Sequence, residues 1–405
     1  MQQTSATGVT TTYAYDALRR QVGVFSESAG GTRSVASVTA YNALGQVESV
    51  TDAADNTTLY LYCPATGRRI TTVDPLGQAT HTAYDLPGRV IATWGATYPV
   101  AYEYDPHGRM TAMYTLRDGA VETNFTDYAA IAANLSAFDK TEWQYDLATG
   151  LLTNKLYAAD NGTTYTYTPQ GQLASRTWAR GIVTEYAYDG HNQLTHITYS
   201  DTTPAATFTY DRLGRQKVVQ TFLSAQHFSY DPVTLALTNE MVIANGVTNS
   251  IARAHDPLGR PEGLGIAGTD YEVAYAYDPL GRFDAVSVAG QAAQYHYVEG
   301  SDLLAGWTNS IPDTGLTRSY EPNRDLLTEV HNQAGGTVSK FAYQNDALGR
   351  RTERLDTFSG VVTNRFAYNA RSEVPNALMG ADSFAWAYDP IGNRQHYTEN
   401  GTTLD

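Results

Sequence analysis

Cysteine is almost absent from this chain, and so are targeting and membrane signals. Cys63 is the only cysteine among the 405 residues, which excludes an internal disulfide and a zinc site built from several cysteines. The N-terminal residues Met1–Ala6 show no basic region followed by an apolar run. No stretch of about 18 apolar residues, the length that spans a bilayer, occurs in the sequence. The sequence thus predicts neither membrane insertion nor a targeting element of its own.

Basic residues are scarce as well. The chain has 27 Lys and Arg against 42 Asp and Glu, and its formal net charge is −15. Because nonspecific binding to nucleic acid needs a basic face, we expect no nucleic-acid partner. The simplest interpretation of the negative charge is that it keeps the chain soluble, and a cationic partner is the alternative.

Tyrosine and glycine, by contrast, are abundant. The chain contains 30 Tyr and 34 Gly, while charged residues make up only 17%. Tyrosine favours the half-buried surface of a strand, and glycine permits the backbone angles of tight turns. The composition therefore predicts an all-β fold with many short turns.

One sequence pattern recurs from end to end. It consists of an aromatic residue, a variable residue, Tyr-Asp, two turn residues, Gly-Arg and an alternating apolar stretch. Clear copies are 102–109, 208–215, 275–282 and 386–393. Weaker copies contain Tyr15-Asp16, Tyr41-Asn42, Tyr84-Asp85, Tyr167-Thr168, Tyr188-Asp189, His255-Asp256 and Tyr368-Asn369. Successive copies mostly start about 20–25 residues apart, which is typical of a repeat array, and each unit is expected to be one β-hairpin.

The residues at the turn of each unit have physical roles, as the copy at 275–282 illustrates. Asp278 opens the turn, since its carboxylate accepts a backbone N–H two residues later. Pro279 supplies the φ of about −65° that a type I turn needs. Gly281 stands where φ must be positive, and Asn192 takes this place in another copy. We therefore predict a three-residue hairpin loop with a G1 bulge.

The aromatic residues form pairs spaced by two positions, which places both members on one face of a strand. Such pairs are Tyr13/Tyr15, Tyr60/Tyr62, Tyr165/Tyr167, Tyr186/Tyr188, Phe228/Tyr230, Tyr295/Tyr297, Phe341/Tyr343 and Phe366/Tyr368. Stacked along a sheet they predict a ladder of cross-strand contacts, each contributing about 0.2–1 kcal/mol.

Two features vary the array. A longer turn occurs at 145–152, 230–237, 297–304 and 320–327. Between Arg109 and Tyr145 the period doubles, and we expect a loop insertion over 118–140. A short helix is expected near 126–135, with Thr126 or Asp127 as its N-cap. Otherwise residues 1–405 are expected to be a single repeat array with almost no helix.

These units resemble YD repeats. They are similar to the repeats of bacterial RHS proteins, of the BC components of insecticidal toxin complexes, of wall-associated proteins of the same group and of animal teneurins. The resemblance covers the chain from Thr11 to about Thr398. One Tyr-Asp-Pro-x-Gly string is a weak signal, whereas more than a dozen units in register are a specific one.

The resemblance implies an antiparallel β-sheet ribbon, curved or spiralling, that forms a hollow shell around a polypeptide, commonly a C-terminal toxin domain. It also implies a secreted or cell-surface parent protein. The last residues, up to Asp405, resemble the opening strand of a further repeat. We therefore expect a partial shell without the family's plug region or a C-terminal toxin domain. Its expected partners are an enclosed polypeptide or toxin cargo and further repeats of a longer parent protein.

No catalytic, cofactor-binding or metal-binding residues are expected, so the chain is not predicted to be an enzyme. His191 and His196 lie close in sequence but have no third ligand, and a surface role is the simpler interpretation. Asp256 and Asp278 stand in the Asp-Pro-x-Gly string that the family's plug region uses for self-cleavage. Ordinary repeat turns contain the same string, so a structural role explains both aspartates.

Two functions are consistent with the sequence. The first is a structural shell segment that encloses a polypeptide. The alternative is an extracellular adhesion or carbohydrate-binding module, since Tyr and Trp present flat apolar faces with a polar edge. The residues that would test it are Trp94, Trp143, Trp178, Trp307 and Trp386. Because the terminal units carry no polar caps, we also expect the chain to self-associate or to open at its ends.

Overall fold

The computed structural model describes residues 1–28, 34–117, 125–159 and 161–404. Strands make up 57% of the chain and helix 2%, which confirms the all-β prediction. In the described part, 36 strands form one sheet, and each pairs antiparallel with its neighbours in sequence, as β16 does with β15 and β17. The sheet is thus one long ribbon of consecutive hairpins.

The strands of the first half are β1 (Gln2–Thr4), β2 (Thr10–Tyr15), β3 (Gln21–Glu27), β4 (Ser34–Tyr41), β5 (Val47–Asp52), β6 (Thr57–Tyr62), β7 (Arg69–Val73), β8 (Ala79–Tyr84), β9 (Val90–Gly95), β10 (Val100–Tyr104), β11 (Met110–Leu116), β12 (Phe138–Tyr145), β13 (Leu152–Leu156), β14 (Gly162–Tyr167), β15 (Leu173–Thr177), β16 (Val183–Tyr188), β17 (Leu194–Tyr199) and β18 (Ala206–Tyr210). Those of the second half are β19 (Gln216–Gln220), β20 (Ser224–Tyr230), β21 (Leu237–Ala244), β22 (Val247–His255), β23 (Pro261–Ile266), β24 (Glu272–Tyr277), β25 (Phe283–Val288), β26 (Gln291–Tyr297), β27 (Leu304–Asn309), β28 (Thr314–Tyr320), β29 (Leu327–Ala334), β30 (Thr337–Asn345), β31 (Arg351–Thr357), β32 (Val361–Ala367), β33 (Asn376–Met379), β34 (Asp382–Tyr388), β35 (Arg394–Glu399) and β36 (Thr402–Leu404).

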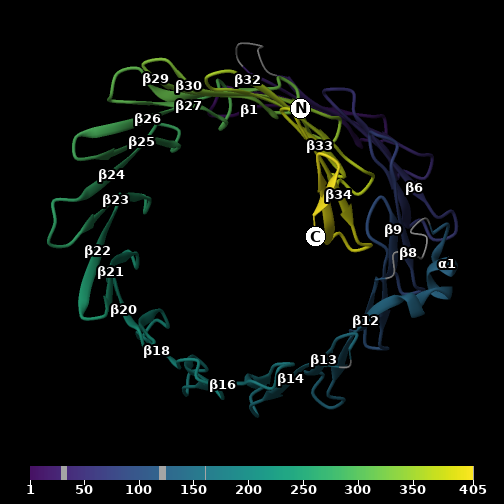
Figure 1. The fold of residues 1–405 in the computed structure, drawn as a ribbon, viewed down its shortest axis with the longest axis horizontal. Coiled ribbons are helices and arrows are strands. Elements are labelled where there is room, and N and C mark those ends of the chain that lie inside the picture. Colours follow the sequence, from purple (N-terminus) through teal and green to yellow (C-terminus); the bar gives the residue numbers. More distant parts are fainter. Residues whose placement is uncertain (29–33, 118–124, 160, 405) are drawn as a thin grey trace.

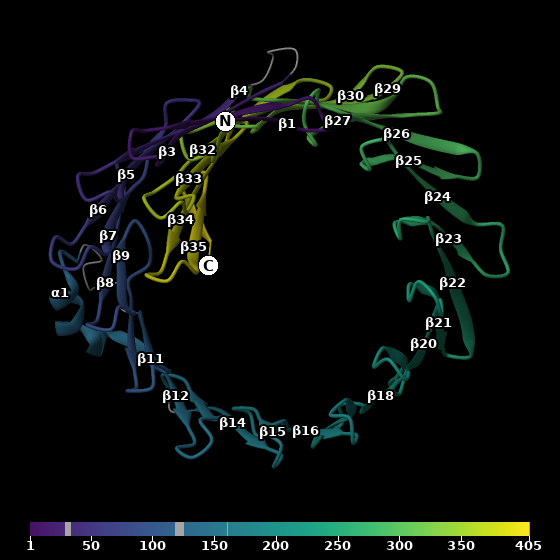
Figure 2. The same ribbon diagram turned by 180° about the vertical axis from the view of Figure 1, so that it is seen from behind.

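The ribbon winds into a ring with an open centre (Figures 1 and 2). After one turn the C-terminal strands β32–β35 lie alongside the N-terminal strands, on the inner side of the ring. The hydroxyl of Tyr98 donates to Glu373 Oε1 at 2.8 Å across this overlap, between residues 275 positions apart. The sheet is therefore a spiral of slightly more than one full turn, which agrees with the predicted curved or spiralling sheet.

The repeat turns have the predicted geometry. The N–H of Arg282 and the N–H of Leu280 both donate to Asp278 Oδ1, each within 2.9 Å. The N–H of Asp278 donates to the carbonyl of Arg282, which closes the loop. Gly281 has φ +83° and Asn192 has φ +64°, so both adopt the left-handed conformation that the sequence predicts.

Replacing Gly281 with valine is expected to lower the free energy of unfolding by about 1–3 kcal/mol. The nearest atom to an added Cβ is Arg260 Nη1 at 3.6 Å, so the positive φ and not a clash sets the cost. The matched control is Gly190→Val, because Gly190 lies in the same kind of turn without a positive φ and has nothing within 4 Å of an added Cβ. Thermal unfolding compares the two variants, and equal melting temperatures would refute the turn assignment.

The insertion differs from its predicted bounds. The expected loop over 118–140 ends earlier, because Phe138, Asp139 and Lys140 already belong to β12 and pair with β11; residues 118–124 lie outside the described part. The expected helix is present as α1 (Tyr128–Ala133), with Asp127 as its N-cap accepting from the N–H of Ala130. A 3-10 turn follows at Leu135–Ala137.

The insertion gives the wall a second layer at one place. Helix α1 lies on the outside of the ring (Figure 1). Its Ile131 packs into a buried cluster with Trp94 of β9, Leu116 of β11 and Phe138 of β12. Apolar burial of this kind is the main source of folding free energy, so this cluster is the hydrophobic core of an otherwise single-layered wall.

Candidate functional site

The wall of the ring is held together by the second tyrosine of most repeats. The hydroxyl of Tyr188 donates to the backbone carbonyl of Leu173 at 3.0 Å, which links each hairpin to the preceding one. The same kind of bond is formed by Tyr41, Tyr62, Tyr84, Tyr104, Tyr145, Tyr167, Tyr210, Tyr230, Tyr277, Tyr297, Tyr320, Tyr368 and Tyr388. A buried carbonyl left without a donor is costly, so these bonds keep the hairpins in register.

The arginine at the end of the repeat connects one turn to the next. Arg282 Nε donates to Asp278 Oδ2 at 2.7 Å, and its Nη1 donates to the carbonyl of Ser301 in the following turn. Its guanidinium also lies 4.2 Å from the centroid of the Tyr297 ring. The same cation–π contact recurs in Arg20/Tyr41, Arg68/Tyr84, Arg89/Tyr104, Arg109/Tyr145, Arg215/Tyr230, Arg260/Tyr277 and Arg350/Tyr368. One edge of the ribbon is therefore a chain of Asp–Arg–Tyr contacts.

These contacts predict a loss of stability in acid. Burial would raise the pKa of Asp278, but the hydrogen bonds from Arg282 and Leu280 outweigh it and hold the pKa below its usual value. The same net direction holds for Asp16, Asp85, Asp105, Asp211 and Asp256. A carboxylate whose pKa is lower in the folded state stabilises the fold above its unfolded pKa of about 3.9, and this contribution is lost as the pH falls through the folded value.

We therefore expect the melting temperature to drop as the pH is lowered from about 5 to about 2, through the range in which these aspartates take up protons. The variant Asp278→Asn is expected to be less stable than the native chain near neutral pH, with the difference shrinking in acid. A difference that stays constant over the whole pH range would show that the Asp278 charge does not contribute.

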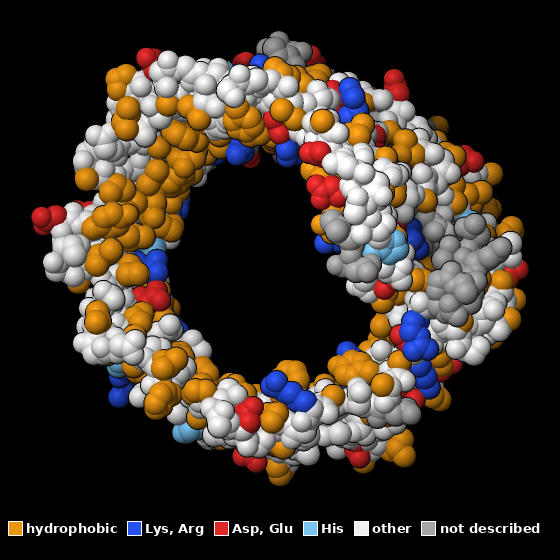
Figure 3. All heavy atoms as spheres, in the orientation of Figure 1, with side chains coloured by type: hydrophobic (Ala, Val, Ile, Leu, Met, Phe, Trp, Pro, Cys, Tyr) orange, Lys and Arg blue, Asp and Glu red, His pale blue; other side chains and the backbone are white. Residues whose placement is uncertain are grey.

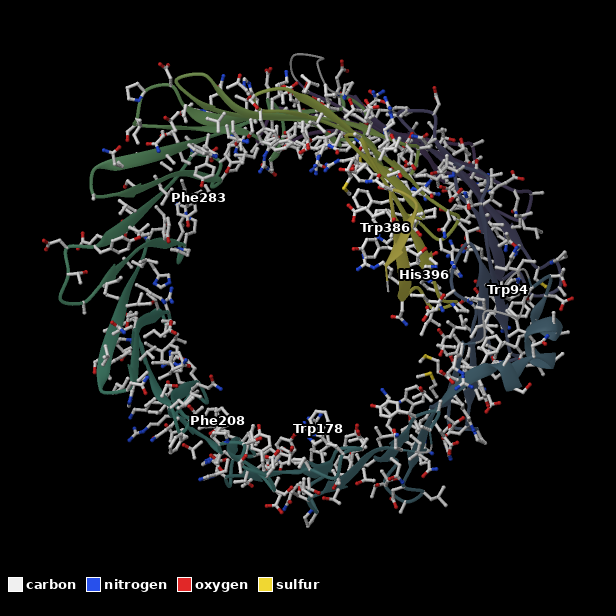
Figure 4. All side chains as sticks on the ribbon, viewed as in Figure 1. Trp94, Trp178, Phe208, Phe283, Trp386 and His396 are labelled. Atoms are coloured by element: carbon white, nitrogen blue, oxygen red, sulfur yellow. The ribbon has the colours of Figure 1, made fainter. Side chains whose placement is uncertain are left out.

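The inner wall of the ring is built by the first aromatic residue of many repeats and by side chains of the return strands. Phe208 and Phe283 lie on the inner side of the wall (Figure 4). Phe208 pairs across the sheet with Val219, and at the equivalent position Tyr186 pairs with Ile197. Because side chains alternate along a strand and every hairpin has the same orientation, equivalent repeat positions share this face. The inner wall is thus lined by aromatic and aliphatic side chains.

The ladder of aromatic contacts is less continuous than predicted. Phe283 of β25 contacts Tyr275 of β24 and Tyr295 of β26, with ring centroids 5.6 and 5.1 Å apart. Elsewhere the first aromatics of successive repeats stand on every second strand, roughly 10 Å apart. An aliphatic residue on the strand between separates them, as Ile197 does after Tyr186.

The inner wall has its broadest apolar area over β22–β27, where the space-filling view shows hydrophobic side chains facing the centre (Figure 3). Strand pairing places Leu264 beside Val273, and Val273 beside Val288, on one face of the sheet. Tyr295 and Trp307 pair on neighbouring strands. A face of this kind suits contact with apolar or aromatic groups of another molecule.

Cationic side chains lie over several of the inner aromatic rings. The guanidinium of Arg176 lies 3.5 Å from the centroid of the Trp178 ring, and the Lys155 ammonium 5.4 Å from that of Trp143. Arg176 Nε is buried without a hydrogen-bond partner. The wall therefore combines aromatic rings with cationic groups, which attract the carboxylates and carbonyl oxygens of another molecule.

The five tryptophans do not form one surface. Trp94 is only 6% exposed and belongs to the core beneath α1, so its proposed role on a binding surface is wrong. Trp178 is 37% exposed and points toward the centre of the ring (Figure 4). Trp143, Trp307 and Trp386 are half-buried. The sequence missed the burial of Trp94 because the insertion that covers it follows two strands later.

The titratable residues singled out in the sequence occupy structural positions. Asp256 and Asp278 sit in repeat turns and pair with Arg260 and Arg282. His191 lies in a turn and His196 on β17, and both are exposed. Among the residues that the structure describes, no group of three or more His, Cys, Asp or Glu is arranged to hold a metal ion. No helix in the described part is long and apolar enough to span a bilayer.

Cys63 takes the turn position that aspartate holds in other repeats, and its thiol is free. Hydrogen bonds from Thr66, opposed by burial, hold the pKa of this thiol below its ordinary value. The Cys63 sulfur thus takes the place of the carboxylate that accepts the turn hydrogen bonds elsewhere, which explains the substitution as a structural one.

Solved structures with the same fold are shells of toxin complexes. The chain is similar to a crystal structure of TcdB2-TccC3-Cdc42, with a TM-score of 0.62 and 11% identity over 97% of this chain. It is also similar to TcdB2-TccC3, with a TM-score of 0.60 and 12% identity, and to a Photorhabdus luminescens Tc holotoxin pore, with a TM-score of 0.59 and 12% identity. The match covers 26% of the first of these chains, so this chain spans about a quarter of their length.

Sequence comparison identifies the family. No curated protein matches the chain, but a model of the RHS repeat matches residues 41–79. A model of the teneurin YD-shell matches residues 127–372, which is more than half of the chain. Together with the repeat turns and the hollow ring, this match shows that the chain belongs to the teneurin YD-shell family.

Proposed function

We propose that this chain is a non-enzymatic structural segment of a shell that encloses a polypeptide. The observation that carries the proposal is the inner wall, where aromatic and aliphatic side chains from successive repeats face an open centre (Figures 3 and 4). A folded partner would need a matching surface, whereas an unfolded chain presents apolar side chains and unpaired backbone groups throughout. The inner wall has apolar side chains and cationic side chains over aromatic rings. It can therefore bind the apolar side chains of an unfolded polypeptide as well as its unpaired carbonyl groups.

The structural neighbours support the structural role in this proposal. They include complexes of TcdB2 with TccC3, one of which also contains Cdc42, and a Tc holotoxin pore. We infer that the cargo of this chain is likewise a toxin or another polypeptide, within a secreted or cell-surface bacterial protein of the polymorphic toxin class. Further repeats, which would continue the ribbon in a longer protein, are the second partner that we propose.

Site-specific cross-linking tests the proposal. An unfolded polypeptide segment is fused after residue 405, because the C-terminal end of the ribbon lies on the inner side of the ring (Figure 1). A photoreactive phenylalanine analogue replaces Phe208 on the inner wall. Its control replaces Leu59, which is 44% exposed and precedes the repeat aromatic Tyr60, so that it faces outward.

Cross-links from position 208 to the fused segment, with few from position 59, are the expected result. Equal yields from both positions, or none from position 208, would contradict an enclosing role. The comparison needs no knowledge of the natural cargo.

Carbohydrate binding is the second candidate. Trp178 favours it, because this side chain is partly exposed and points into the ring (Figure 4). Arg176 covers one face of its ring, which leaves the other face for a sugar to stack on. Binding to a glycan array that is abolished by Trp178→Ala would favour this function, and an array without signal from folded protein would remove it.

A further inference from the structure

The ribbon has two different edges. Because all hairpins have the same orientation, the Tyr-Asp turns lie together on one edge, which we call the YD rim. The connections from each return strand to the next repeat lie on the other edge, the opposite rim. Leu18 and Leu213 are turn residues of the YD rim, and Phe222 and Leu223 connect β19 to β20 on the opposite rim.

Within one chain, the YD rim of the second turn of the spiral already packs on the opposite rim of the first turn of the spiral. Tyr98, in the connection between β9 and β10, donates to Glu373 at the end of a repeat turn. The Arg371 guanidinium lies 5.1 Å from the centroid of the Tyr98 ring. A Cβ added at Gly300, in another repeat turn, would meet Ser28 and Val9 at 3.0 and 3.2 Å. Each contact joins the YD rim of the second turn of the spiral to the opposite rim of the first turn of the spiral.

Several leucines of the YD rim are more exposed in the first turn of the spiral than an equivalent residue in the second. Leu348 is the third residue of a repeat loop, Asp346 being the first. This loop belongs to the second turn of the spiral, and Leu348 is half-buried there. At the same repeat position in the first turn, Leu18, Leu213 and Leu258 are 74%, 63% and 77% exposed. The YD rim of the first turn of the spiral therefore presents a row of exposed leucines.

The opposite rim is uncovered beyond the overlap. Phe222 and Leu223 are 85% and 65% exposed there, and Val247 is 58% exposed. A groove of about 620 Å³ lies between the connections that contain Pro204 and Phe222. This rim has the same place in the ribbon as the segments at Val9, Ser28 and Tyr98, which the second turn contacts.

We propose that a second copy of this chain docks the YD rim of its first turn on the uncovered opposite rim of the first copy. The interface continues the rim-to-rim packing seen within the chain and inserts turn leucines such as Leu213 into the groove beside Phe222. Since the two rims are different surfaces, the contact is heterologous and adds copies in one direction. The proposal does not depend on whether the ring encloses a cargo.

Charge sets the conditions under which the copies associate. Each copy carries a net charge of −15, so two copies repel one another at low ionic strength. Salt screens this repulsion over a Debye length of about 8–10 Å at physiological ionic strength. Association through apolar rims is therefore expected to strengthen as salt is added, whereas association through ion pairs would weaken.

Two rim variants test the proposal. One variant carries Phe222→Asp and Leu223→Asp on the opposite rim, and the other carries Leu18→Asp and Leu213→Asp on the YD rim. Carboxylates buried in an apolar contact should weaken self-association by roughly a hundredfold. The control is Leu59→Asp, an exposed leucine within β6 and away from both rims. Circular dichroism establishes that each variant keeps its strand content, and sedimentation velocity of the full chain gives the size of the assembly.

The expected results separate this mode from others. The native chain and Leu59→Asp form assemblies that grow with concentration and salt, and each rim variant alone is monomeric. An equimolar mixture of the two rim variants forms a one-to-one complex and nothing larger, because only one intact YD rim and one intact opposite rim remain. A native chain that stays monomeric in high salt would overturn the proposal. So would rim variants that assemble like the native chain, or a mixture that does not associate.

Discussion

Replacing Leu116 with alanine is expected to lower the free energy of unfolding by about 2–5 kcal/mol. Leu116 ends β11 and is completely buried against the cluster that α1 covers. Truncation would leave a cavity in the packed cluster between the sheet and α1, and cavities in buried cores are only partly filled by relaxation of their surroundings. Urea denaturation followed by circular dichroism measures the change.

The matched control for this prediction is Leu147→Ala. Leu147 lies in a repeat turn with 95% of its side chain exposed, and its truncation should change the free energy of unfolding by less than about 0.5 kcal/mol. Equal effects of the two substitutions would mean that the cluster beneath α1 is not a core.

Replacing Glu373 with alanine is expected to open the overlap between the two turns of the spiral. The Glu373 carboxylate is 6% exposed, pairs with Arg371 at 3.1 Å and accepts hydrogen bonds from Tyr98 and Asn369. Removing one partner of a buried ion pair costs about 3–5 kcal/mol, because the remaining charge stays buried and unpaired. The ion pair lies within the repeat turn at 369–373, and Tyr98 contacts this turn from the first turn of the spiral. Loosening it should also weaken the contact with Tyr98, so hydrogen exchange should accelerate at residues 369–375 and 95–99.

Two further variants define this effect. Tyr98→Phe removes one hydrogen bond but leaves the ion pair, so it should cost only about 1 kcal/mol. Glu262→Ala removes an exposed carboxylate on β23 and should leave exchange at 95–99 unchanged. If Glu373→Ala also leaves exchange at 95–99 unchanged, the contact does not hold the two turns together.

The local structure of the repeat could be predicted from the sequence because each residue in the turn has one strong physical preference. Asp278 and Gly281 adopt the roles that their chemistry favours. The N-cap at Asp127 follows from the same logic, since a short side chain with an oxygen acceptor precedes an apolar helix. Such features depend on a few adjacent residues, so no tertiary information is needed.

The role of the second tyrosine is visible in the sequence. The first aromatic of a pair varies, as in Phe208 and Trp386, whereas the second is tyrosine in most repeats, as in Tyr210 and Tyr388. A position that needed only an apolar ring would accept phenylalanine. The requirement for a hydroxyl therefore signals the hydrogen bond to the preceding hairpin that the structure shows.

The closure of the ring could not be predicted in the same way. The curvature of a ribbon is the sum of small twists between many strands, and neither hairpin type carries a separate signal for its twist. The partners Tyr98 and Glu373 are 275 positions apart, so no repeat pattern connects them. The burial of Trp94 depends likewise on an insertion that the repeat does not specify.

The central claim is that the chain is one continuous ribbon wound past a full turn around an open centre. Electron microscopy of the purified chain tests it most directly. Class averages viewed down the ring should show a hollow particle whose wall is doubled on the side where β32–β35 lie alongside the N-terminal strands (Figure 2). A filled globule, or an extended ribbon whose ends do not meet, would contradict the account.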